Sequence, residues 1–210
     1  EVRPDAMASN CSDYLPKEYF FDKSFKIQFF ERADWEQGVP IQNNNLQVWY
    51  TDGSRGESGT GLGIFGPNCK ISLSLGYHTS IFQAEMVAIR LCAELILERR
   101  VGGTDILIAT DSLSSLKALS SCQVDSKLVK ESIETLNKLG IGNKLILGWV
   151  PGHSGVEGNE TADLLAKRGA ESCFVGPEPW CAVPSARIFD TLTSWSTEES
   201  KKFWLSQTGL

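Results

Sequence analysis

The hydrophobic positions of residues 46–75 follow the two-residue period of β-strands. Leu46, Val48 and Tyr50 alternate up to Asp52, and two further runs, 60–65 and 70–75, are also strand-like. Residues typical of turns, mainly Gly, Ser, Pro and Asn, separate the three runs. This pattern predicts a three-stranded antiparallel meander with Asp52 at the end of its first strand and a turn over 53–59.

A helical period follows from residue 79 to about residue 100. A Thr or Ser can cap its start, a Gly pair ends it, and Glu85 lies on or beside its inward-facing stripe. Residues 105–110 are apolar on both faces and predict a buried central strand that ends at Asp111. A strand, a helix and a strand of these lengths predict a right-handed crossover between parallel strands.

The next part of the chain predicts three further helices and a fifth strand. The helices cover 112–119, 126–139 and a stretch that begins near 156–159 and carries Asp163; the strand covers 144–150. A Gly-rich loop, 151–155, joins this strand to the last of these helices. We therefore expect an α/β fold with a mixed sheet of three antiparallel strands and two parallel ones.

The flanking segments have no such clear period. Residues 1–45 are rich in aromatic residues, residues 173–184 contain three prolines, and residues 185–206 predict one or two amphipathic helical turns. We expect an N-terminal extension (1–45) that packs on the core or on a missing upstream domain, one domain (46–172), and a C-terminal linker with a short helical tail (173–210). The sequence begins without Met, which suggests a piece of a longer polypeptide.

Composition narrows the class of protein. A chain of 210 residues that is 41% hydrophobic and 22% charged is globular, and its net charge of −6 disfavours a protein that grips polyanions without help. This charge is still compatible with an enzyme whose bound cations mediate contact with a polyanionic substrate. Six scattered cysteines without a C-x-x-C pair make a zinc site improbable and favour reduced thiols inside the cell. No long apolar run or signal peptide points to a membrane.

Four carboxylates are predicted to meet at one edge of the sheet. Asp52 and Asp111 end neighbouring parallel strands, Glu85 lies near the start of the crossover helix, and Asp163 follows the Gly-rich loop. Two carboxylates about 4 Å apart repel by roughly 4 kcal/mol at an effective dielectric near 20, so such a cluster stays partly protonated or holds cations. Oxygen ligands without Cys or His favour Mg²⁺ or Mn²⁺, and two such ions support in-line phosphodiester hydrolysis.

Each of these residues alone also has an ordinary explanation. Asp52 can form a turn, Asp111 can cap a helix, and Glu85 and Asp163 can be surface charges. His153 lies in the Gly-flanked loop beside the expected cluster, where it is either a solvated side chain or a proton shuttle.

No small-molecule cofactor is expected. Gly61, Gly63 and Gly66 match the spacing of a dinucleotide fingerprint, but a Pro-containing turn and another strand follow instead of a helix.

Five blocks of sequence resemble the ribonuclease H family, in the family's order. They are Tyr-Thr-Asp-Gly-Ser at 50–54, Gln-Ala-Glu at 83–85, Ala-Thr-Asp-Ser at 109–112, Trp-Val-Pro-Gly-His-Ser-Gly at 149–155 and Gly-Asn-Glu-Thr-Ala-Asp at 158–163. The resemblance implies a five-stranded mixed sheet with helices on both faces and cleavage of the RNA strand of RNA–DNA hybrids with Mg²⁺, or Mn²⁺ as a substitute. It implies that Asp52, Glu85, Asp111 and Asp163 bind two metal ions, that His153 is the mobile histidine, and that Gly53, Ser54, Ser112 and Asn159 lie near the substrate.

The sequence departs from the cellular members of the family just before Glu85. Ile81, Phe82 and Gln83 stand where those members carry Asn, Gln and Arg, so contacts with the RNA 2′-OH would have to come from backbone groups. The basic handle of some members is also absent, which predicts weak, salt-sensitive binding of the hybrid.

The details are similar to the ribonuclease H domain of a non-long-terminal-repeat retrotransposon polyprotein, which implies an upstream reverse transcriptase. Two alternatives remain open at this point. One is a catalytically silent domain that binds hybrid or braces a polymerase, and the other is a nuclease or recombinase of the same superfold that cuts DNA. The intact set of carboxylates favours an active enzyme, and the Gly-His-Ser-Gly loop disfavours the DNA-cutting alternative.

Overall fold

A computed structural model describes residues 12–176, 178 and 180–207 of the chain. The first eleven residues of the predicted extension, including Cys11, and two of the three prolines of the predicted linker lie outside the described residues.

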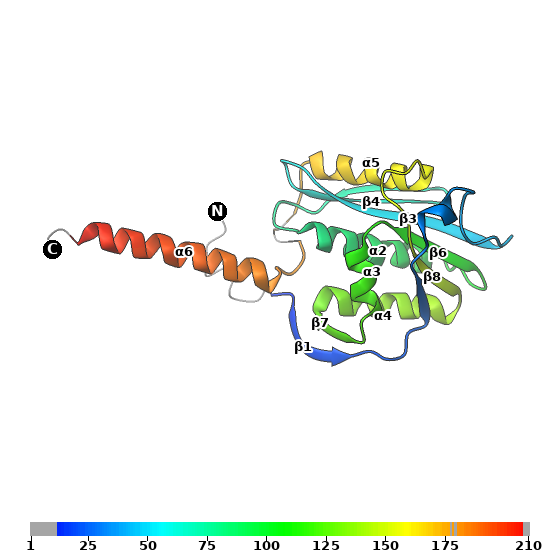
Figure 1. Ribbon diagram of the computed structural model, residues 1–210, viewed down its shortest axis with the longest axis horizontal. Coiled ribbons are helices and arrows are strands. Elements are labelled where there is room, and N and C mark those ends of the chain that lie inside the picture. The colour runs from blue at the N-terminus through cyan, green and yellow to red at the C-terminus, as the bar shows by residue number, and fades with distance from the viewer. Residues whose placement is uncertain (1–11, 177, 179, 208–210) are drawn as a thin grey trace.

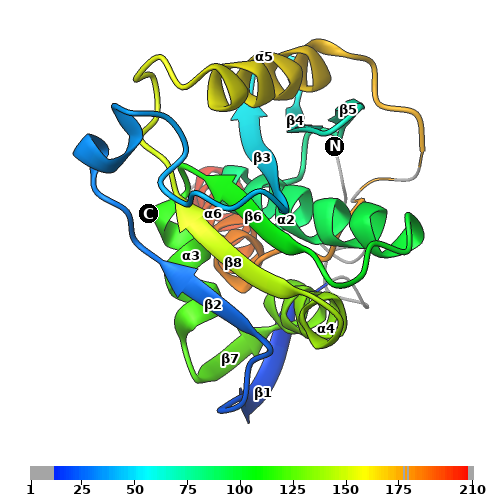
Figure 2. The same cartoon turned by 90° about the vertical axis from the view of Figure 1, so that its right-hand side faces the viewer.

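The centre of the molecule is a mixed sheet with the strand order β2-β8-β6-β3-β4-β5 (Figure 2). The predicted antiparallel meander and the two predicted parallel strands are all present, so the fold class is confirmed. The described sheet has a sixth strand, β2, which pairs in parallel with β8 and comes from the segment predicted as an extension. The strands are β2 (Phe25–Gln28), β3 (Leu46–Arg55), β4 (Thr60–Gly66), β5 (Cys69–Ser74), β6 (Asp105–Thr110) and β8 (Lys144–Trp149).

Strand β3 is longer than predicted. Its parallel pairing with β6 ends at Thr51 opposite Thr110, but its antiparallel pairing with β4 continues to Arg55. Asp52 therefore lies where the parallel pairing ends, inside the strand and not at its end. The predicted turn over 53–59 is wrong in its first half, because β4 supplies backbone hydrogen bonds to residues 53–55.

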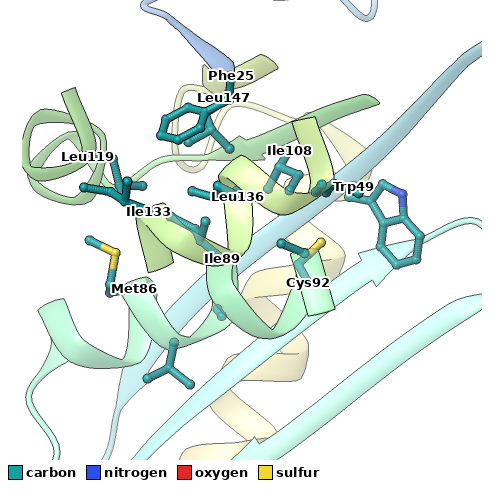
Figure 3. Packing of buried hydrophobic residues seen from close by; sticks show 14 of the residues in the cluster. Phe25, Trp49, Met86, Ile89, Cys92, Ile108, Leu119, Ile133, Leu136 and Leu147 are labelled. Atoms are coloured by element: carbon teal, nitrogen blue, oxygen red, sulfur yellow. The ribbon is translucent and has the colours of Figure 1, made fainter. Parts of the chain in front are cut away.

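Helices cover both faces of the sheet, as predicted. Helices α2, α3 and α4 lie on one face and α5 lies on the other (Figure 1). Trp49, Ile108 and Leu147 of the sheet pack against the α2 and α4 side chains in the larger hydrophobic core (Figure 3). The helices are α2 (Ile81–Glu98), α3 (Leu113–Ser120), α4 (Lys127–Ile141) and α5 (Glu157–Glu171).

The glycines of β4 allow α5 to lie close to the sheet. A Cβ atom on Gly61 or Gly63 would overlap the backbone of α5 at Ala162, Ala166 and Ala170. The Gly-x-Gly spacing is therefore a helix-packing feature, and β4 runs through a turn into β5 without opening a helix. This close contact places Asp163 of α5 over the strand that carries Asp52.

The N-terminal segment packs on the domain. It forms β1 (Tyr14–Tyr19), which pairs with β7 (Gln123–Ser126) in a separate two-stranded sheet, then β2, then the 3-10 turn η1 (Arg32–Trp35). Phe30 and Trp35 are buried in a second hydrophobic cluster on the α5 side of the sheet, together with Tyr50 and Val150.

The C-terminal residues form one long helix, α6 (Ser185–Ser206), which projects away from the domain (Figure 1). Its 22 residues exceed the one or two helical turns that were predicted. Phe189, Trp195, Phe203 and Trp204 along it are exposed. Among the described residues, no helix is long and apolar enough to cross a membrane.

Candidate active site

Asp52 and Glu85 are brought together by a close approach of α2 to β3. Ser80 caps α2 and accepts a hydrogen bond from Gln83 N, which places Glu85 in the first turns of the helix. A Cβ atom on Gly53 would lie 2.8 Å from Glu85 N and 3.1 Å from Glu85 Cγ. Only glycine fits at this position without displacing the helix, so Gly53 sets the distance between the two carboxylates.

Asp111 follows β6, next to Asp52 across the parallel pairing. Trp149 Nε1 donates a hydrogen bond to Asp111 O (3.2 Å), and the side chain of Asn159 hydrogen-bonds the Asp111 carboxylate. Gly152 lies directly beside this carboxylate, since a Cβ atom there would be 2.8 Å from Asp111 Oδ2. Neighbouring segments thus fix both the backbone and the side chain of Asp111.

The predicted acids form two adjacent groups. Ligand atoms of Asp52, Glu85 and Asp111 lie within 4.8 Å of one another, and a second group within the same limit contains His153, Glu160 and Asp163. The two groups are close enough to interact, because the charge of Asp163 raises the pKa values of both Asp52 and Asp111. The structure therefore brings all five predicted catalytic residues to one edge of the sheet, with His153 and Asp163 in the second group.

Burial and mutual repulsion disfavour the ionised forms of the first group. Burial, followed by the charges of Asp111 and Asp163, raises the pKa of Asp52 to about 7. Burial, followed by the charges of Asp52 and Asp111, raises the pKa of Glu85 well above its usual value. Burial also raises the pKa of Asp111, although the hydrogen bond from Asn159 opposes this effect.

These acids fit a hard divalent cation. Glu85 Oε2 is buried and has no hydrogen-bond partner among the described residues, although it lies beside two other carboxylates. A bound cation would satisfy this oxygen and would offset both the burial and the mutual repulsion that raise the three pKa values. The donor set contains oxygen only, which suits Mg²⁺ or Mn²⁺ better than zinc.

His153 lies on the exposed side of the site. Its backbone adopts a left-handed conformation (φ +49°), and the neighbouring Ser154 Oγ donates a hydrogen bond to Pro151 O (2.7 Å) within the same loop. Its imidazole is exposed, unlike the carboxylates of Asp52 and Glu85.

The predicted substrate residues have different environments. Gly53 and Ser54 are half-buried in β3, and the Ser112 hydroxyl accepts a hydrogen bond from Ser115 N as the cap of α3. Asn159 is only 2% exposed and points toward Asp111. The structure thus places Asn159 behind the carboxylates, where it can orient Asp111.

Two neighbours of Asp163 were not predicted from the sequence. Glu160 joins the second group, and Lys167 Nζ lies 2.7 Å from Asp163 Oδ2. The signal was their spacing, because residues three and four apart share one face of a helix. This spacing is common on exposed helices, so it does not single out a functional pair.

Fold and site together define an α/β domain with a carboxylate cluster at the carboxyl edge of its parallel strands, an arrangement suited to metal-assisted phosphodiester chemistry. The family model described as RNase H matches residues 44–171. This match covers more than half of the chain, and the chain belongs to the RNase H family.

Individual proteins give the same family. The chain is similar to ribonuclease H of Schizosaccharomyces pombe, with 32% identity over 179 residues, covering 74% of this chain and 63% of the yeast protein. It is also similar to ribonuclease H of Nitrosospira multiformis, with 29% identity over 144 residues, covering 60% of this chain and 90% of the bacterial protein. The match therefore spans less than two thirds of the yeast relative.

Among solved structures, RNase H1 from the halophilic archaeon Halobacterium salinarum NRC-1 aligns with a TM-score of 0.46 and 19% identity. The alignment covers 61% of this chain and 99% of the archaeal one.

Proposed function

We propose that this chain is a ribonuclease H that hydrolyses the RNA strand of RNA–DNA hybrids, leaving 3′-hydroxyl and 5′-phosphate ends. The observation that carries this proposal is the buried cluster of Asp52, Glu85 and Asp111 within the segment that matches the family, with a Glu85 oxygen left unpartnered. The relatives named ribonuclease H support the same reaction.

Asp52, Glu85, Asp111 and Asp163 would hold two Mg²⁺ ions, for which Mn²⁺ can substitute. When bound, such ions activate water as the nucleophile and stabilise the leaving oxygen. Asp52 is suited to the central position, because the charges of Asp111 and Asp163 both act on it. The Gly53 backbone favours the ionised forms of Asp52 and Glu85, and the Asn159 side chain favours that of Asp111, since each lowers the pKa of the neighbouring carboxyl group.

His153 would exchange a proton with the leaving 3′ oxygen or assist product release. It is exposed beside Glu160 and Asp163, and an imidazole can both accept and donate a proton. Because it is on a loop and not buried with the acids, it can act on the proton without being required for cation binding.

The hybrid would pass over the end of β3. Gly53 and Ser54 are half-buried there and offer a backbone and a hydroxyl group to the RNA strand, beside the exposed side of the carboxylate cluster. Asn159 and Ser112 would act indirectly, Asn159 through Asp111 and Ser112 by capping the helix that follows Asp111. With a net charge of −6, the chain depends on cations to approach the polyanion.

We further propose that the chain works inside the cell beside an upstream reverse transcriptase, as part of a retrotransposon polyprotein. The support is the sequence resemblance stated above, together with the exposed aromatic side chains of α6, which suit contact with another domain. All five described cysteines are free thiols, which agrees with a reducing compartment.

One assay tests the activity. The chain is incubated with end-labelled RNA–DNA hybrid, duplex DNA and duplex RNA, each with Mg²⁺, Mn²⁺ or EDTA. We expect cuts in the RNA strand of the hybrid alone, in either metal and not in EDTA. Binding of the hybrid without metal-dependent cutting would identify a silent domain, and cutting of duplex DNA would identify a different nuclease of the same superfold; either result overturns the proposal.

A further inference from the structure

The face of the sheet that carries α5 is covered by two separate parts of the chain. Helix α5 covers β3, β4 and β5, whereas residues 30–41 of the N-terminal arm (residues 14–41) cover the other half of this face. The arm lies outside the segment that matches the RNase H family. Its side chains Phe30 and Trp35 are nevertheless as buried as the core, at 6% and 5% exposure.

The arm is attached to the strand that leads into the His153 loop. Strand β2 pairs with β8 in register from Phe25 opposite Leu145 to Gln28 opposite Gly148. Gly148 leaves room for the Phe30 ring, since a Cβ atom there would lie 2.7 Å from Phe30 Cε2. The arm thus holds β8 up to the residue before Trp149, just where the strand ends.

Trp35 continues this contact at the end of β8. Its Nε1 donates a hydrogen bond to Trp149 O (3.1 Å), and its ring meets the Phe30 ring edge-on at a centroid distance of 6.0 Å. Trp149 Nε1 in turn donates to Asp111 O. Trp149, the last residue of β8, is therefore hydrogen-bonded to the arm through its carbonyl and to the backbone of Asp111 through its indole.

Within the loop, Ser154 Oγ donates a hydrogen bond to Pro151 O, and Gly155 N donates one to Glu160 Oε1 (3.3 Å). His153 and Gly155 both have positive φ, at +49° and +80°, and cavities of about 250 and 580 Å³ separate parts of the arm from the loop. Trp35 lines both cavities, as do Ser154 of the loop and the adjacent Val156. At the start of the loop the backbone is held by two hydrogen bonds, from Trp35 Nε1 to Trp149 O and from Val150 N to Thr110 O (3.0 Å). Of these two, only the bond from Trp35 comes from the arm, and it lies close to His153, which has a left-handed backbone.

We infer that Trp35 is a positioning residue that holds the turn from β8 into the His153 loop, so that His153 faces Asp163 and Glu160. The functional part of this inference rests on the proposed ribonuclease H activity. The arm is then a working part of the catalytic domain, although it lies outside the family match.

The test compares Trp35→Phe with Trp49→Phe as a matched control. Both changes remove an indole N–H from a buried ring, but Trp49 Nε1 has no hydrogen-bond partner among the described residues and lies on the opposite face of the sheet. Hydrogen–deuterium exchange of peptides covering 150–158 is measured in both variants, below the unfolding temperature of each. We expect Trp35→Phe to increase exchange at least threefold in this loop and Trp49→Phe to leave it unchanged. Unchanged exchange in Trp35→Phe, or an equal increase in both variants, overturns the inference.

A double-mutant cycle then tests whether Trp35 acts through His153. Trp35→Phe should lower kcat on the hybrid about threefold to tenfold with little change in KM, and should have almost no further effect when combined with His153→Ala. An equal loss of kcat in both backgrounds would show that Trp35 acts on stability alone. If the wild-type chain does not cut hybrid at all, the proposed function fails, whereas the exchange measurement still decides whether Trp35 holds the loop.

Discussion

The two halves of the candidate site are built in opposite ways. Asp52 and Glu85 are buried on regular elements, and the Gly53 backbone fixes their spacing, whereas His153 is exposed on a loop with a left-handed backbone. Buried carboxylates on strands and helices keep one geometry, which a cation site requires. A histidine that moves protons gains from an exposed and adaptable position. The contrast predicts that the first half decides whether the reaction occurs and that the second half decides how fast it proceeds.

The largest effect is expected at the buried half. Asp52→Asn or Asp111→Asn removes a cation ligand and should lower hybrid cleavage by several orders of magnitude while the fold survives. Circular dichroism checks the fold, and single-turnover cleavage in Mg²⁺ gives the rate. The matched control is Asp125→Asn, an exposed acid on β7 away from both groups, which should cut at the wild-type rate.

The exposed half should tolerate substitution better. His153→Ala is expected to lower kcat by about 10- to 100-fold, in line with partial loss of general acid–base help. Binding of Mn²⁺ should be nearly unchanged, because the carboxylates remain. A loss as severe as that of Asp111→Asn would show that the two halves do not differ as described.

The pH dependence of stability tests whether the ionised carboxylates of the buried half destabilise the folded chain. In the folded chain the pKa of Asp52 is raised to about 7 from an ordinary value of 3.8, so the folded state binds a proton that the unfolded state has already released. Stability without metal should therefore fall as the pH rises from about 4 to 7. Asp52→Asn should remove part of this fall and raise Tm in EDTA at pH 8 by a few degrees, with a smaller difference at pH 5.

Differential scanning fluorimetry in EDTA at the two pH values checks this prediction. Added Mg²⁺ should raise the Tm of the wild type more than that of Asp52→Asn. If Asp52→Asn were less stable than the wild type at pH 8 in EDTA, the ionised Asp52 carboxylate would not destabilise the folded chain, and this prediction would be wrong.

The smallest effect is expected at Lys167, whose side chain contacts Asp163 on the exposed side of the site. Its ammonium group contacts Asp163 and competes with a cation for that carboxylate. Lys167→Met should lower the Mg²⁺ concentration for half-maximal cleavage about two- to threefold, a modest change because the ion pair is exposed. The comparison is Lys202→Met, which breaks an ion pair with Glu199 on α6 and should leave the Mg²⁺ dependence unchanged.

The periodic parts of the fold were predictable from the sequence. The alternation around Tyr50 and the helical stripe around Glu85 gave the right elements, since each buries one face on the same core. Strand β2 was missed because Phe25–Gln28 is only four residues long, and its strand character depends on pairing with β8, which is distant in sequence. The extension of β3 beyond Asp52 depends in the same way on its antiparallel partner.

In the candidate site, too, some residues were predictable from a local pattern, whereas the placement of others depends on distant parts of the chain. Asp52 and Asp111 were predictable because each directly follows the parallel pairing of β3 with β6, which ends at one edge of the sheet. The placement of Asp163 with His153 and Glu160, and the burial of Asn159 behind Asp111, depend on how closely α5 approaches β4. The distance between α5 and β4 is set by glycines in β4 and alanines in α5, so it cannot be predicted from the pattern of either segment alone.

The most direct test of the cation site is the anomalous diffraction of Mn²⁺ in crystals of the chain. Crystals of the wild type and of Asp52→Asn are soaked at a Mn²⁺ concentration that supports cleavage, and difference maps are compared at the manganese edge. We predict a peak within coordination distance of Asp52, Glu85 and Asp111 in the wild type and its loss in the variant. A wild-type map without density there, or with density only beside His153 and Glu160, would contradict the assignment of these carboxylates as the cation site.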